Sequence, residues 1–170
     1  IIHGAGYNGG IEFNRMFPAD IYFKTTTMAL NLYRAAGEIN KYTSTTNPMT
    51  ISGIMASCSY PDLESGFFTE TDLHKGPPNK TVECHGLAKR TIEDFGRQVW
   101  KQYQIPCQSL ILTNSFGLYD SYHPDKTKVV GGMIRKFVDA RFANLPEVTF
   151  WGDGSPKREF IYCMDAGRII

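Results

Sequence analysis

Short apolar runs alternate with longer stretches of helical periodicity, and this alternation limits the possible folds more than any other feature. Residues 50–57 (TISGIMAS) lie between Pro48 and Pro61, and residues 108–113 (QSLILT) form a second short run. Neither run has the strict alternation of a strand with one face in water, so both are predicted to be buried on both faces. Buried strands between helices predict an α/β protein with a mostly parallel sheet.

Helical periodicity is found on either side of the first strand. The first helix is predicted over about residues 18–39, because Pro18 suits a helix start and apolar residues follow at near-helical spacing. The second is predicted over about 82–103 and a third within 128–142. Residues 114–128 read as a long polar and aromatic loop, residues 148–154 as a strand and a turn, and residues 158–163 as a short strand. The apolar residues at near-helical spacing in the first helix are Ile21, Met28, Leu32 and Ala35.

Composition narrows the class of protein. The chain has 170 residues, 42% of them hydrophobic, which fits one domain of ordinary size, and its net charge of +1 gives no indication of a nucleic-acid or membrane-surface partner. No apolar run approaches the roughly 18 residues of a membrane span.

The Ile-Ile start and Ile-Ile end predict that the sequence is a piece of a longer protein, expected to be cytoplasmic. The cysteines form no C-x-x-C pair and are interpreted as separate reduced thiols rather than a disulfide framework or a zinc site: Cys58, Cys84, Cys107 and Cys163.

The opening stretch IIHGAGYNGG contains Gly4, Gly6 and Gly9 in the spacing G-x-G-x-x-G. This spacing is typical of a dinucleotide phosphate turn only when a strand precedes it and a helix opens on its last glycine. Three residues precede Gly4, and Pro18 would break a helix that began at Gly9. The alternative is a glycine-rich loop after a short strand. Because ligands gather beyond the carboxyl ends of parallel strands, such a loop would still lie beside a ligand.

A family resemblance emerges from five consecutive motifs: IIHGAGYNGGIEFN, ASCSYPD, HKGPPNKTVECHGLAKR, LTNSFGLYDSYHP and WGDGSPKREF. Together they resemble GDP-L-fucose synthase, an extended short-chain dehydrogenase/reductase that acts on nucleotide sugars, over essentially the whole chain. The resemblance implies a Rossmann-like sheet that lacks its first βαβ portion, where the family carries its dinucleotide fingerprint. Residues 1–114 and 148–170 would belong to the dinucleotide-binding domain, and residues 115–147 to a smaller substrate domain.

The resemblance also implies a Ser, Tyr and Lys reductase site, and this chain departs from it. Lys89 matches the lysine that holds the cofactor ribose, but His85 stands at the tyrosine position and Ala56 at the serine position. Ser57 is one residue further along and faces the other side if the strand continues there. His85 can donate a proton, although the Lys89 ammonium would disfavour its charged form. The alternative is a packing histidine in a site that has lost its acid.

A second catalytic pair is implied for epimerisation. Cys58 matches the cysteine that exchanges protons beside a keto group, and Lys128 stands at the position of its histidine partner. Lys128 resembles the lysine of the related GDP-mannose 3,5-epimerases. The alternative for Cys58 is packing after a strand.

The remaining implied sites bind ligands. Trp151 and Arg158 match residues that hold the nucleotide, and Lys136 replaces an arginine for the diphosphate. The cofactor NADP would contact Ser57, Lys89, Asn114 and Phe116. Two hypotheses follow: an NADP-dependent epimerase/reductase for a nucleotide sugar, most simply a GDP-sugar, or a catalytically impaired relative that serves as a structural or regulatory subunit of an assembly. Family members pair as dimers through the helices matching 18–39 and 82–103.

Overall fold

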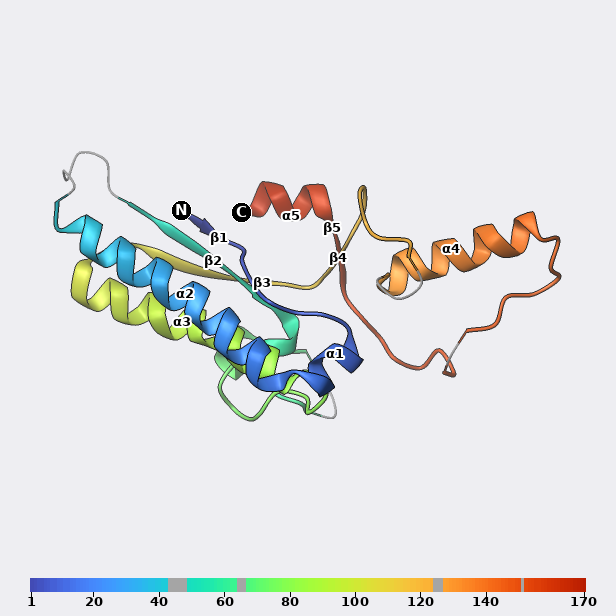
Figure 1. The fold of residues 1–170 in the computed structure, drawn as a ribbon, viewed down its shortest axis with the longest axis horizontal. Coiled ribbons are helices and arrows are strands. Elements are labelled where there is room, and N and C mark those ends of the chain that lie inside the picture. Colours follow the sequence, from blue (N-terminus) through green and yellow to red (C-terminus); the bar gives the residue numbers. More distant parts are fainter. Residues whose placement is uncertain (43–48, 64–66, 124–126, 151) are drawn as a thin grey trace. The chain divides into compact units, whose positions relative to one another are not determined.

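The computed structural model describes residues 1–42, 49–63, 67–123, 127–150 and 152–170. Its contacts divide the chain into two units (Figure 1). The first comprises Ile1–Leu112 with Ile170, and the second comprises Thr113–Ile169. The expectation that residues 148–170 complete the dinucleotide-binding domain stays a prediction.

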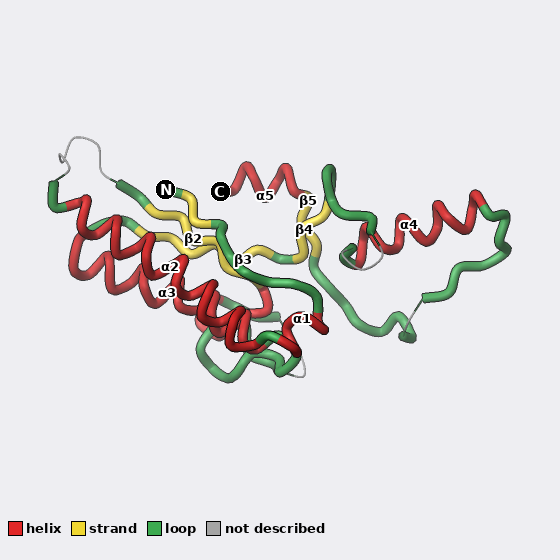
Figure 2. The backbone as a smooth tube through the Cα atoms, viewed as in Figure 1, coloured by secondary structure: helices red, strands yellow, loops and turns green. Residues whose placement is uncertain are grey.

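The first unit is a parallel sheet with helices packed on it (Figure 2). Its strands follow the order β1-β2-β3, with Ile2 paired to Ser52 and Ile51 paired to Cys107. The expected α/β class, the parallel sheet and the short pairing strand at the start of the chain are therefore confirmed. In chain order its elements are β1 (Ile2–His3), α1 (Ile11–Met16), α2 (Pro18–Asn40), β2 (Ile51–Ala56), the 3₁₀ turns η1 (Ser57–Ser59) and η2 (Glu70–Asp72), α3 (Glu83–Tyr103) and β3 (Cys107–Leu112).

Pro18 and a residue with left-handed backbone angles lie at helix ends. Helix α1 ends at Met16, and α2 begins with Pro18 in its first position. Helix α3 ends on Gln104, whose φ of 55° is left-handed. The core between α2, α3 and the sheet is formed mainly by Ala29, Tyr33, Ala36, Ile51, Met55, Leu73, Ile92, Val99 and Ile105.

Gly53, in the middle of β2, allows α3 to lie close to the sheet. A Cβ atom at this position would run into the Ile92 side chain and would lie 2.7 Å from the Tyr33 hydroxyl. Tyr33 and Ile92 are both fully or almost fully buried, so neither can move aside freely. The close approach of helix and strand therefore depends on a residue without a side chain.

We expect Gly53→Ala to lower the free energy of unfolding by about 1–3 kcal/mol, because overpacking forces buried side chains off their rotamers. Urea unfolding followed by circular dichroism would measure the change. Gly4→Ala is the matched control, since no atom lies within 4 Å of the place that a Cβ would take there. Equal stability of the two variants would contradict the role given to Gly53.

The second unit contains β4 (Asn114–Phe116), α4 (Val129–Phe142), β5 (Phe160–Tyr162) and α5 (Cys163–Ile169), with β4 and β5 parallel. Helix α4 and strand β5 confirm two predictions. The strand predicted at 148–150 is wrong: the Phe150 ring packs on Phe137 of α4, 5.3 Å between centroids, instead of joining a sheet. Strand β4 lies in a segment predicted to be loop, because its partner strand is far away in the sequence, with Asn114 paired to Phe160.

Two predictions from the sequence concern membrane-spanning helices and disulfide bonds. Within them, no helix is both long enough and apolar enough to cross a bilayer. No disulfide joins Cys58, Cys84, Cys107 or Cys163, all four of which are described.

Candidate active site

The turn that carries Cys58 begins where β2 ends. Ala56 has extended backbone angles (φ −130°, ψ 150°), and the 3₁₀ turn η1 starts at the next residue. Ser57 is thus not part of the strand, and its side chain is exposed. The alternation of strand residues does not apply to Ser57, so the geometric objection to it as a substitute for the missing serine does not hold.

His85 and Lys89 lie one turn apart on α3, and both are buried, at 7% and 5% exposure. The Lys89 ammonium donates to the carbonyl oxygen of Ile54 at 2.9 Å and to that of Ala5 at 3.3 Å. These carbonyls belong to β2 and to the loop after β1. The lysine therefore ties α3 to the carboxyl ends of two parallel strands, the edge at which α/β proteins bind ligands.

The surroundings of Lys89 are electrostatically unusual. Burial lowers the pKa of Lys89, and the nearby Cys58 opposes this shift. His3 is also buried and lies edge-on to Tyr33, with ring centroids 6.3 Å apart. Burial, and then the charge of Lys89, lower the pKa of His3. A buried amine with a lowered pKa beside a thiol is the kind of arrangement found at functional sites.

His3 makes stability dependent on pH. Its pKa is lower in the folded than in the unfolded state, so the unfolded state binds a proton first as the pH falls below about 6.5. Folding stability is therefore expected to be lost between neutral pH and the lower, folded pKa of His3. Chemical unfolding between pH 7.5 and 5 should show a shallower loss in His3→Gln than in the unaltered protein. Parallel curves would show that His3 does not contribute.

Cys58 lies at the centre of η1 and is partly exposed. Gly86 of α3 packs directly against its backbone, because a Cβ atom at Gly86 would run into the Cys58 carbonyl oxygen. The structure thus brings together the predicted residues Ser57, Cys58, His85 and Lys89 within the first unit.

The glycine-rich loop lies beside this cluster. A Cβ at Gly6 would lie 3.4 Å from the Lys89 ammonium, so the loop backbone passes close to the lysine. Helix α1, which follows the loop, has only six residues and ends before Pro18. Gly4, Gly6 and Gly9 therefore form a loop against the lysine and do not open a long helix, as the second interpretation of the motif expects.

The other predicted residues belong to the second unit. Asn114 is held on β4, where its side-chain amide donates to the Glu159 carbonyl at 3.1 Å. Lys136 on α4 donates to the Thr149 carbonyl at 3.0 Å, and its ammonium lies 5.1 Å from the Phe150 ring centroid. Phe116 packs on two aromatic rings of β5. Lys128 occupies the N-cap position of α4 and is exposed, as is Arg158. Trp151 lies outside the described residues.

Sequence reasoning missed several residues of the first unit. His3 gave no signal because a buried histidine beside a lysine 86 positions away cannot be recognised locally. Gly86 lies inside the H-G-L-A-K motif, where a glycine in a helix is itself a hint of close packing. Arg90 follows Lys89 directly, and its adjacent position on the helix was the only clue.

Comparisons with known proteins identify the family of this chain. The model of the NAD dependent epimerase/dehydratase family matches residues 1–170. The chain belongs to this family. GDP-L-fucose synthase of Escherichia coli (strain K12) is 31% identical over 161 residues, which cover 92% of this chain and 47% of that protein. GDP-L-colitose synthase of Yersinia pseudotuberculosis is 31% identical over 172 residues, with 100% and 53% covered.

Solved structures lead to the same family. A GDP-L-fucose synthetase from Naegleria fowleri bound to NADP superposes with a TM-score of 0.81 at 26% identity, covering 99% of this chain and 53% of that one. A UDP-glucose 4-epimerase from Thermotoga maritima shares the fold, with a TM-score of 0.72 at 19% identity, over 98% and 48%. The resemblance to GDP-L-fucose synthases and the Rossmann-like class are thereby confirmed. The chain spans about half the length of the curated relatives that it matches.

Proposed function

We propose that the protein containing this chain is an NADP-dependent nucleotide-sugar epimerase/reductase that acts on a GDP-linked keto sugar. The observation that supports it most strongly is the cluster at the carboxyl edge of the parallel sheet, where Lys89 is buried beside Cys58 and one turn from His85. The relatives with 30–31% identity that span this chain include GDP-L-fucose synthases and GDP-L-colitose synthase. A GDP-sugar is therefore the substrate class that the comparisons favour.

The residues present fit one end of NADP. The loop after β1 offers backbone without side chains at Gly4 and Gly6, and nothing lies within 4 Å of a Cβ at Gly4. Lys89 lies against this loop and would hold the ribose next to the nicotinamide, with Asn114 and Phe116 assigned to the same end by resemblance. NADP supplies the hydride of the reduction when it is bound.

Cys58 is the proposed base for proton exchange. A hydrogen on a carbon beside a keto group is acidic enough for a positioned thiolate to remove, and an acid must then return a proton. Cys58 lies on a turn that α3 holds in place, with the Lys89 charge nearby to favour its ionised form. By resemblance, Lys128 would be the acid, Trp151 and Arg158 would hold the nucleotide base and diphosphate, and Lys136 would contact the diphosphate.

The second candidate is a relative with impaired reduction that serves as a structural or regulatory subunit. Two substitutions favour it, since His85 and Ala56 stand where the family has a phenol and a hydroxyl. The Lys89 ammonium, moreover, donates to two backbone carbonyls inside the fold. A lysine satisfied in this way also contributes to packing, which needs no ligand.

Hydrogen exchange separates the two candidates. The intact protein would be incubated with a GDP-4-keto-6-deoxy sugar in deuterated buffer, and the C3 and C5 hydrogens followed by NMR. The epimerase proposal expects exchange without added NADPH, and the impaired-subunit proposal expects none.

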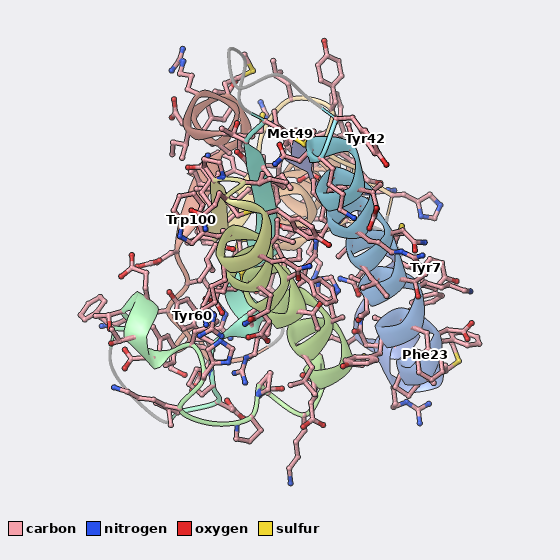
Figure 3. The ribbon with its side chains drawn as sticks, turned by 90° about the vertical axis from the view of Figure 1, so that its left-hand side faces the viewer. Tyr7, Phe23, Tyr42, Met49, Tyr60 and Trp100 are labelled. Carbon is pink, nitrogen blue, oxygen red and sulfur yellow. The ribbon has the colours of Figure 1, made fainter. Side chains whose placement is uncertain are left out.

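We propose that the protein associates with a second copy of itself. Apolar side chains are exposed on the outer faces of α2 and α3, which lie side by side in Figure 3 with Phe23 and Trp100 labelled. Phe23 and Leu30 of α2 are 64% and 45% exposed, and Trp100 of α3 is 48% exposed. A hollow lined in part by Tyr22, Phe23 and Leu87 lies between the two helices. Two copies that pair these faces would form a four-helix bundle, as the resemblance implies.

We expect the intact protein to be a dimer by light scattering, and Leu30→Glu to shift it to monomer, because a carboxylate buried in an apolar interface is costly. Phe67→Glu is the matched control, since Phe67 is 94% exposed and belongs to neither helix. A monodisperse monomer before any substitution would contradict the dimer.

A further inference from the structure

A second stripe of α3 lies beside the His85–Lys89 stripe and contacts the turn that carries Cys58. Gly86 and Arg90 are four residues apart, so they share one face of the helix. Gly86 packs on the carbonyl oxygen of Cys58, and the Arg90 Nε donates to the carbonyl oxygen of Ser59 at 2.6 Å. Two successive turns of one helix thus contact two successive carbonyls of η1, and the second of these contacts is a hydrogen bond.

Arg90 is an unusual residue to bury. It is 8% exposed, and Ser59 is fully buried beneath it. Among the described residues, the Nη2 atom of Arg90 and the hydroxyl of Ser59 have no hydrogen-bond partner. Burial lowers the pKa of Arg90, and the charge of Asp94 opposes the shift. An apolar side chain of similar volume often gives equal or greater stability at such a site.

The hydrogen bond of Arg90 is made to η1, the turn that carries Cys58. The amide of Tyr60 donates to the Ser57 carbonyl at 3.1 Å and closes η1 from within. The Arg90 bond fixes the same turn from outside, one residue after Cys58, and Figure 3 shows Tyr60 next to α3. These contacts hold the backbone of the turn and so fix the direction of the Cα–Cβ bond of Cys58.

We propose that Arg90 is a positioning residue, which holds η1 so that the Cys58 thiol keeps the direction needed for proton transfer. The role in catalysis rests on the proposed function, whereas the hold on Cys58 does not. Arg90 acts through the backbone of the turn and touches no reacting atom. Because the guanidinium carries several donors in a rigid fork, lysine replaces it only in part.

The test compares Arg90→Met, Arg90→Lys and Arg97→Met in the intact protein. Arg97→Met is the matched control, because Arg97 lies on the same helix and its ion pairs are with Glu93 and Asp94 of that helix. Each cysteine would be alkylated with iodoacetamide at pH 7 and its rate followed by mass spectrometry. Cys84 and Cys107, in the same unit, report any general loosening.

We expect Arg90→Met to raise the alkylation rate of Cys58 severalfold while Cys84 and Cys107 keep theirs. Exchange of the sugar hydrogens should fall by about 10²-fold, the effect that a displacement of about 1 Å can have on a catalytic group. Arg90→Lys should lie between, and Arg97→Met should match the unaltered protein. If Arg90→Met does not fold, Arg90→Lys gives the same readouts.

An unchanged Cys58 rate in a folded Arg90 variant would overturn the positioning role, as would an equal rise at all three cysteines. The alkylation result is independent of activity. If the unaltered protein exchanges no sugar hydrogens but Arg90→Met releases Cys58 alone, the proposed function fails while the hold on Cys58 stands.

Discussion

Cys58→Ser is expected to slow hydrogen exchange at the sugar by on the order of 10²-fold or more, the range in which a positioned general base contributes. The reason is the acidity of the two groups. A thiol is a far stronger acid than a serine hydroxyl, and the positive charge of Lys89 lies near Cys58, so the thiol is the better base precursor at neutral pH. The side chains have nearly the same size, so the turn η1 should keep its shape. NMR in deuterated buffer would follow the C3 and C5 hydrogens.

Cys84→Ser is the matched control for this experiment. Cys84 lies on α3, next to His85, and its thiol faces Asn14 at 3.5 Å instead of the turn η1. We expect this variant to exchange as the unaltered protein does. Exchange that survives in Cys58→Ser would refute Cys58 as the base, and a loss in both variants would show that exchange depends on packing around α3.

The fold was predictable to the extent that its signals are local. Strands β2 and β3 appear within a residue or two of their predicted bounds, because short apolar runs between helices have few alternatives. Helix α2 was placed correctly, but not all of the apolar residues that indicated it are buried. Ile21 is buried, whereas Ala35 is exposed, and the core positions include Thr25 and Tyr33. A polar threonine and a phenol can be buried only where the partner surface fits, and the sequence of the helix does not contain that surface.

The candidate site was predictable in its members and not in their arrangement. The motif around Cys58 and the spacing of His85 and Lys89 indicated the residues, because both are short segments. The neighbours of Lys89 come from elsewhere: Ala5 and Ile54 supply carbonyls from two strands. Ile54 and Ala5 are 35 and 84 residues from Lys89 in the sequence, and parallel strand pairing brings them together. No local sequence pattern reports contacts over such separations.

His85 and Ala56 stand where the family has a tyrosine and a serine, and restoring both residues should restore reduction. His85→Tyr combined with Ala56→Ser is expected to raise NADPH-dependent reduction of a GDP-4-keto-6-deoxy sugar by about 10²–10⁴-fold. As the hydride reaches the keto carbon, its oxygen becomes negative and needs a proton. A tyrosine at position 85 would lie one turn before Lys89, whose charge favours the phenolate that is left behind. A serine at position 56 would add a hydrogen bond to the same oxygen.

Packing decides whether the double variant can show this gain. His85 is 7% exposed, so a larger ring must be accommodated beside the turn η1, and unfolding curves are needed before rates are compared. His85→Phe with Ala56→Ser is the matched control, because it has the same ring without the hydroxyl. NADPH absorbance would measure the rate. A gain in the tyrosine variant alone would assign the defect to the missing acid. Equal rates in two folded variants that both bind NADPH would show that the proton donor does not limit reduction.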